Sequence, residues 1–209
     1  QVFLLVEGGI MTNNFFDAVK NRRTYYNISS DSTVSDERLR EIIEYAVKHS
    51  PSAFNSQSGR TVLLLGKHHE KFWNMTEDVL RGFVPADQFQ QTADKMQSFR
   101  AGHGTILFFE DQNIVKSLQE QFPLYAANFP VWSNQSSAML QFVVWTGLET
   151  EGLGASLQHY GELIEDAVKA EWKVASEWKL IAQMPFGKPL SEPGEKSFED
   201  ISKRSLVFK

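Results

Sequence analysis

The sequence contains no cysteine, which excludes disulfide bonds, thiolate-bound metals and a cysteine nucleophile. No apolar run reaches the roughly 18 residues that a membrane-spanning helix requires. Basic residues are not in excess either: 21 lysines and arginines stand against 26 aspartates and glutamates, a formal net charge of −5. No basic field therefore invites nucleic acid. The absence of cysteine fits a reducing compartment, and we expect a cytoplasmic protein with neither nucleic-acid nor membrane partners.

What is present is typical of one globular domain. The 209 residues are 42% hydrophobic and 12% aromatic, with no low-complexity linker, which suits a chain with a single sizeable core. We therefore expect residues 11–209 to form one domain. The ten residues before Met11 carry no basic flank and no cleavage pattern, so a signal peptide is not expected. We interpret them as an added leader, with the natural start at Met11.

Helical and strand patterns alternate along the chain. Helical spacing of apolar residues predicts a first helix over residues 13–21 with Phe16 inward, a second that Ser35 caps and Pro51 ends, and further helices over residues 69–81, 85–100, 123–150 and 162–169. Strands are predicted over residues 61–65, 104–109, 153–158, 178–186 and 205–208. The alternation indicates an α+β or α/β protein with a central sheet.

The longest helical pattern, residues 123–150, has large apolar residues at several angles around its axis. They include Trp132, Met139, Phe142 and Trp145. One core would need only one face of a helix. We therefore expect this helix to be central or to be buried at a subunit interface.

Arg22, Arg23 and Thr24 follow the first predicted helix. Two guanidinium groups and a hydroxyl can bind a phosphate through charge-assisted hydrogen bonds. By themselves these residues also suit a solvated helix end, because arginines near a C-terminus complement the helix dipole.

Ser52, Asn55 and Gln57 belong to a polar loop between a helix and a strand. Asn and Gln side chains offer paired donors and acceptors, which can match the imide edge of a flavin or a nucleobase. The alternative is a capping loop whose amides serve its own backbone.

Two further clusters lie late in the chain. Gly152-Leu153-Gly154 precedes the predicted strand that holds Leu157, Gln158 and His159, whereas the glycines of a dinucleotide fingerprint follow a strand. His159 is a possible proton donor or a structural histidine. Lys203 and Arg204 form a basic pair near the end, which is equally an ordinary basic tail.

In their order, these clusters resemble the nitroreductase family, over nearly all of residues 11–209. That family has an early Arg-Arg-Ser/Thr, a Pro-Ser-x-x-Asn-x-Gln loop, a late Gly-Leu-Gly before a strand and a terminal basic pair. Two segments, 132–136 and 154–160, are similar to the branch that holds the fungal Frm2-type and the bacterial copper-induced nitroreductases. In two places the chain departs from the family: Ser58-Gly59 replaces the frequent Pro-Trp, and Tyr26 stands where a Lys or Arg commonly lies near the flavin pyrimidine. The missing charge would come from elsewhere, for instance Arg23 or Arg100.

The resemblance implies a nitroreductase-like α+β fold with a mixed or antiparallel sheet flanked by helices, and a homodimer with the long helix at its interface. It implies one FMN per subunit, with Arg22, Thr24, Lys203 and Arg204 around the phosphate. Ser52, Asn55 and Gln57 would lie near the ring, some reaching across from the other subunit, and the backbone of residues 157–159 would pass N5 and O4. The cofactor-binding residues implied are Arg22, Arg23, Thr24, Ser52, Asn55, Gln57, Leu157, Gln158, His159, Lys203 and Arg204.

The implied activity is hydride transfer from NADH or NADPH to a nitroaromatic, a quinone or a similar electron-poor acceptor by a ping-pong mechanism. The chemistry would take place on the flavin, so no catalytic side chain and no metal ligand are assigned. Two other functions stay open on the sequence: an FMN-binding sensor or flavin store with little turnover, and an interaction module without a cofactor.

Overall fold

The computed structural model describes residues 15–209, and the predicted leader and Met11 lie outside the described residues. Its helices are α1 (Phe15–Asn21), α2 (Asp36–His49), α3 (Lys67–Leu80), α4 (Phe89–Arg100), α5 (Gln112–Gln121), α6 (Phe129–Thr150) and α7 (Gly161–Trp172). Its strands are β1 (Ile28–Ser29), β2 (Gly59–Leu65), β3 (Gly104–Asp111), β4 (Gly154–Ala155) and β5 (Trp178–Pro189). Short 3-10 turns η1 (Ala53–Asn55), η2 (Pro123–Tyr125) and η3 (Ile201–Lys203) complete the described part.

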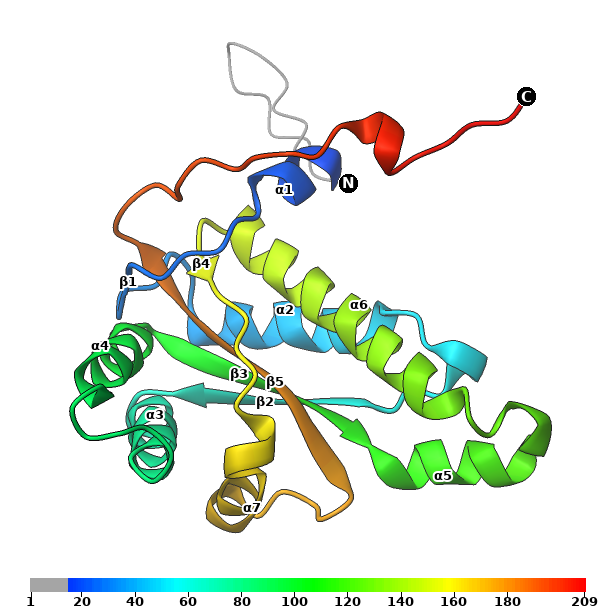
Figure 1. The fold of residues 1–209 in the computed structure, drawn as a ribbon, viewed down its shortest axis with the longest axis horizontal. Coiled ribbons are helices and arrows are strands. Elements are labelled where there is room, and N and C mark those ends of the chain that lie inside the picture. The colour runs from blue at the N-terminus through cyan, green and yellow to red at the C-terminus, as the bar shows by residue number, and fades with distance from the viewer. Residues whose placement is uncertain (1–14) are drawn as a thin grey trace.

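The five strands form one antiparallel sheet in the order β1-β5-β3-β2, with β4 added beside β5. Strand β3 lies between β5 and β2, and all eight of its residues are buried. A strand that is buried along its whole length needs cover on both faces of the sheet. The helices supply that cover, with α2 and α6 on one side and α3, α4 and α7 on the other (Figure 1). The α+β class is confirmed.

Two hydrophobic cores result from the alternation of side chains along β3. Ile106 and Phe108 pack with α2 and α6, whereas Leu107 and Phe109 pack with α3, α4 and α7. Successive residues of a strand point to opposite faces, so one apolar run serves both cores.

Local signals placed several boundaries correctly. Ser35 caps α2, its hydroxyl accepting a hydrogen bond from the Arg38 amide at 3.2 Å, and the helix ends at His49, just before Pro51. Other expectations were wrong. Helix α5 was not expected: Asp111 ends β3 and also caps α5, accepting from the amides of Asn113 and Ile114.

Two predicted strands and one buried side chain also differ from expectation. Residues 205–208 form no strand, and only Gly154–Ala155 of the strand predicted over residues 153–158 is one. Phe16 is 71% exposed rather than inward, because α1 packs on α6 mainly through Ala18.

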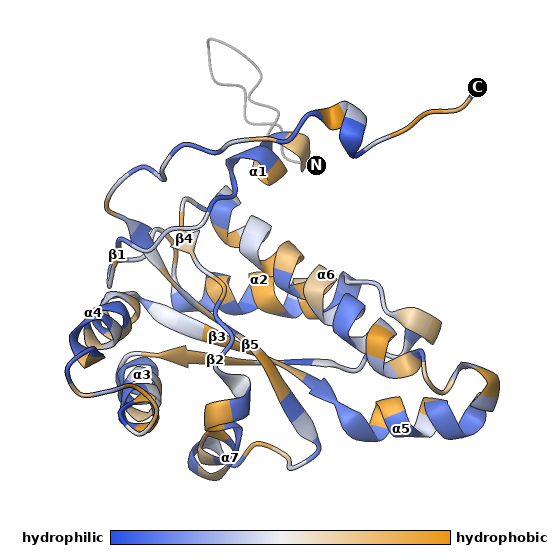
Figure 2. Ribbon diagram, in the orientation of Figure 1, coloured by the Kyte–Doolittle hydropathy of each residue, from blue (hydrophilic) through white to orange (hydrophobic). Residues whose placement is uncertain are grey.

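The segment after β5 leaves the body of the molecule. It passes α1 and extends outward to the C-terminus (Figure 1). Its apolar residues are exposed, from Phe198 at 76% to Phe208 at 90%. Figure 2 shows hydrophobic residues both at this end of the chain and along α6.

Candidate cofactor-binding site

The structure brings the Arg22–Thr24 segment and the segment after Gly152 together, although they lie far apart in the sequence. Thr24 forms a parallel bridge with Ala155 of β4, and the Tyr25 amide donates to the Ala155 carbonyl oxygen at 3.0 Å. Gly154 permits this approach, because a Cβ at that position would lie 2.8 Å from the Tyr25 ring. The chain from Arg22 to Tyr25 therefore runs directly beside β4.

Arg22 is a cation without a hydrogen-bonded partner among residues 15–209. Its guanidinium carbon lies 4.3 Å from the centre of the Trp145 ring of α6, and its Nε atom is buried with no acceptor. Burial lowers the pKa of Arg22, an effect that the nearby Glu149 carboxylate opposes and Arg23 adds to. Stacking on an aromatic ring holds a guanidinium in place while its N–H groups stay available for an anion.

The segment around Gln158 presents an open strand edge. Gln158 exchanges both backbone hydrogen bonds with Gln183 of β5, at 2.7 and 2.9 Å. Because alternate residues face opposite ways, the amides of Leu157 and His159 point away from β5, and neither donates a hydrogen bond within residues 15–209.

The side chains of this segment have different surroundings. That of Gln158 is 6% exposed and donates to the Ser156 hydroxyl at 3.1 Å, so it is committed to the fold. Leu157 packs against the core, and His159 is exposed.

A cavity of about 530 Å³ opens next to both of these segments. Tyr26, two residues after Thr24, lines it, and so does Tyr160, the residue after His159. The opposite wall comes from the end of α3, the turn after it and α4: Leu80, Val84, Gln91, Thr92, Lys95 and Ser98. Small-molecule pockets commonly have this size and this mixture of apolar and polar walls. The sequence patterns missed the contribution of α4.

The Ser52–Gln57 loop is tightly turned. The Ser52 hydroxyl accepts from the Gln57 amide at 3.0 Å, and Phe54, Asn55 and Gln57 all have positive φ angles, of 57°, 50° and 50°. Non-glycine residues with such angles are strained and persist only when their surroundings hold them there.

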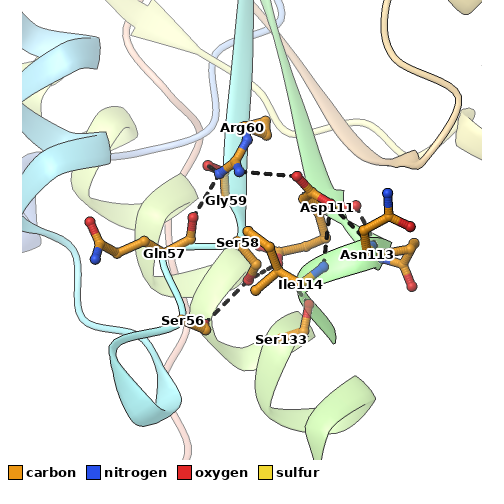
Figure 3. A network of polar contacts seen from close by, with 11 residues as sticks. Ser56, Gln57, Ser58, Gly59, Arg60, Asp111, Asn113, Ile114 and Ser133 are labelled. Atoms are coloured by element: carbon orange, nitrogen blue, oxygen red, sulfur yellow. Dashed lines mark hydrogen bonds and ion pairs between the residues drawn. The ribbon is translucent and has the colours of Figure 1, made fainter. Parts of the chain in front are cut away.

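A polar network anchors this loop (Figure 3). The hydroxyls of Ser58 and Ser133 donate to one carboxylate oxygen of Glu110 at 2.6 and 2.7 Å, and Arg60 pairs with Asp111 at 3.0 Å. Burial raises the pKa of Glu110, against the smaller lowering effect of the two hydroxyls. The sequence reasoning did not single out Glu110, although a carboxylate at the end of a buried apolar run was a possible signal.

The structure does not bring all the predicted residues together within one chain. The Ser52–Gln57 loop lies against α6 near Ser136 and Leu140, where it lines a cavity of about 340 Å³, whereas Arg22 lies against Trp145. Along α6 the step from Ser136 to Trp145 corresponds to roughly 13 Å.

The remaining basic residues of the prediction lie in or on the C-terminal segment. Lys203 and Arg204 are exposed and project away with that segment, and Lys203 lies 3.5 Å from Glu199. The Arg23 guanidinium donates to the Gly194 carbonyl oxygen, so it binds the first part of the C-terminal segment.

Two structural findings bear on membranes and metals. No helix between residues 15 and 209 has the length and apolar character needed to cross a membrane. Over the same residues, no group of three or more His, Asp or Glu side chains is arranged to hold a metal ion.

Comparison with known proteins gives consistent matches over most of the chain. A model of the nitroreductase family matches residues 19–188. Nitroreductase FRM2 of Saccharomyces cerevisiae is 32% identical over 189 residues, which cover 90% of this chain and 94% of that protein.

Two solved structures of nitroreductases are also similar to this chain. CinD of Lactococcus lactis, a nitroreductase in complex with chloramphenicol, is 45% identical with a TM-score of 0.86, over 94% of this chain and all of the CinD chain. A putative nitroreductase of Desulfovibrio desulfuricans in complex with FMN shares the fold, with a TM-score of 0.67 at 20% identity, over 95% of this chain and 99% of that one.

Proposed function

The chain belongs to the nitroreductase family of flavoprotein-type oxidoreductases, and we propose that it binds FMN and transfers hydride from NADH or NADPH to electron-poor acceptors by a ping-pong mechanism. Nitroaromatics and quinones are the proposed acceptors; CinD was solved with 4-nitrophenol. The observation that carries the proposal is the Arg22 guanidinium, which has no hydrogen-bond acceptor within residues 15–209, beside a segment in which the amides of Leu157 and His159 also have none. A cytoplasmic location stays a prediction.

The residues present fit FMN. The phosphate needs cations and donors, which Arg22 and Thr24 offer at one end of the edge formed by residues 155–159. The ring needs donors at its N5 and O4 atoms, which the amides of Leu157 and His159 offer. When bound, FMN supplies the hydride chemistry itself, accepting from the nicotinamide and giving to the acceptor. The protein fixes the position of the ring and the charges around it.

The remaining predicted residues support a homodimeric site. Ser52, Asn55 and Gln57 lie toward the opposite end of α6 from Arg22, so a two-fold axis across α6 would place the loop of one subunit near the flavin of the other. The exposed C-terminal segment would carry Lys203 and Arg204 toward a phosphate only once it is packed in the assembly.

The first test is the cofactor. We expect purified protein to be yellow or to take up one FMN per chain, and to oxidise NADH or NADPH when a quinone or nitroaromatic is added. Flavin released by heat and compared with standards should be FMN. Release of FAD, or protein that stays colourless after soaking in FMN, would contradict the proposal. Bound FMN without turnover would favour the sensor or flavin store.

Replacement of Arg22 tests the phosphate assignment. Loss of a charged hydrogen bond in Arg22→Ala should weaken FMN binding by about 1.5–3 kcal/mol. That is roughly tenfold or more in affinity. Riboflavin has no phosphate, so its affinity should barely change. Arg40→Ala is the matched control, because Arg40 is an exposed arginine of α2 that, within residues 15–209, pairs only with Glu44, at 3.7 Å. Equal losses for FMN and riboflavin would show that Arg22 acts on the fold or on the ring.

A further inference from the structure

The two arginines that could replace the basic residue missing at Tyr26 are engaged elsewhere. Arg23 donates to the Gly194 carbonyl oxygen. Arg100 pairs with Glu77 at 2.8 Å and donates to Asn74 at 2.7 Å. Both guanidinium groups are thus held by other parts of the chain, and the positive charge beside the ring needs another source.

Lys95 of α4 lies on the wall of the 530 Å³ cavity that Tyr26 and Tyr160 also line. Its Nζ atom is 5.7 Å from the ring centre of Phe99 and 6.0 Å from that of Tyr160. No carboxylate within residues 15–209 lies close enough to form an ion pair with it, and it is the one cation among the described residues that line this cavity.

The position of Lys95 on α4 is set by the helix. Gln91, Lys95 and Ser98 follow one another at i, i+4 and i+7, so they share the face that lines the cavity. Met96 and Phe99 lie on the buried side and fix the rotation of α4 against the core that it forms with α3 and α7. The packing of α4 therefore places Lys95 at the cavity wall, with an exposed side chain whose Nζ atom lies over the Phe99 and Tyr160 rings.

We propose that Lys95 is the cation that stabilises the reduced flavin, taking the role that a basic residue at the place of Tyr26 would otherwise have. This inference rests on the proposed FMN site, because Tyr26 and Tyr160 border the segments assigned there to the phosphate and the ring. The reduced ring carries a negative charge near its pyrimidine edge, and a nearby positive charge stabilises the reduced ring more than the neutral oxidised ring. Lys95 thereby sets how readily the bound flavin accepts electrons.

The test is the midpoint potential of bound FMN in the wild type and in Lys95→Met, measured by equilibration with a reference dye. We expect the reduction equilibrium constant to fall about tenfold in the variant, the scale of one charge near a partly solvated site. A tenfold change is about 30 mV for a two-electron couple. The midpoint potential of bound FMN in Lys95→Arg should be close to that of the wild type, because this variant keeps the positive charge. Lys116→Met removes an exposed lysine from α5, away from the cavity, and should change nothing.

The outcomes separate this inference from the proposed function. Unchanged potential in a Lys95→Met protein that still binds FMN would overturn the role of Lys95 and leave the FMN site intact. If Lys95→Met fails to fold, Lys95→Gln keeps a polar side chain and is held to the same expectation. A wild-type protein that takes up no FMN would overturn the proposed function and this inference together.

Discussion

Glutamate in place of both Met139 and Val143 is expected to give a colourless, inactive monomer. These side chains are 40% and 38% exposed on α6 of the isolated chain, beside Phe142 at 37%. Contiguous apolar surface of this kind is uncommon on monomers, and a partner subunit using the same helix would cover it. Two buried charges at such an interface would cost far more than a dimer could tolerate.

Dimer, flavin and activity should disappear together in this variant, because the proposed pocket takes residues from both chains. Light scattering reports the mass, absorbance reports the flavin, and NADH oxidation reports the activity. The matched control is Leu163→Glu on α7, where the side chain is 39% exposed and should tolerate the charge. A stable, flavin-loaded and active monomer near 23.8 kDa would refute both the interface and the shared pocket.

Trp73→Ala is expected to lower the free energy of unfolding by about 3–5 kcal/mol, the range for truncation of a large buried aromatic residue. Trp73 is fully buried, and its Nε1 donates to the Thr105 hydroxyl at 2.9 Å. Its ring centre lies 4.6 Å from that of Phe99 and 6.1 Å from that of Tyr160. The indole therefore supports α4 and Tyr160 from behind, and its loss should also loosen the cavity that they line.

Urea unfolding of Trp73→Ala, of Trp73→Phe and of a control separates these effects. Trp73→Phe keeps most of the packing but loses the hydrogen bond to Thr105, a change of about 1 kcal/mol. The control is Trp172→Ala, because Trp172 is only partly buried and bonds to His68 at 3.2 Å. The free energy of unfolding should fall clearly less in Trp172→Ala than in Trp73→Ala. Equal losses of stability at Trp73 and Trp172 would show that the packing around Trp73 does not dominate the core formed by α3, α4 and α7.

The sequence by itself determined the features that depend on neighbouring residues. The apolar run over residues 104–109 gave a buried strand, and the hydroxyl of Ser35 marked the start of α2, because strand burial and helix capping are local effects. The order of four short motifs was enough to predict the family, which the comparisons confirm. Asp111 both ends β3 and caps α5, and the sequence patterns predicted the strand but missed the helix that follows it.

Only the tertiary structure decided which of these features meet. Thr24 lies beside Ala155, and Lys95 shares a cavity with Tyr26 and Tyr160, because the sheet and the packing of α4 bring distant segments together. No spacing in the sequence records such contacts, since they depend on sheet order and on the rotation of each helix about its axis. For the same reason, the motifs did not show that Arg22 and the Ser52–Gln57 loop lie at different places along α6, which only the tertiary structure shows.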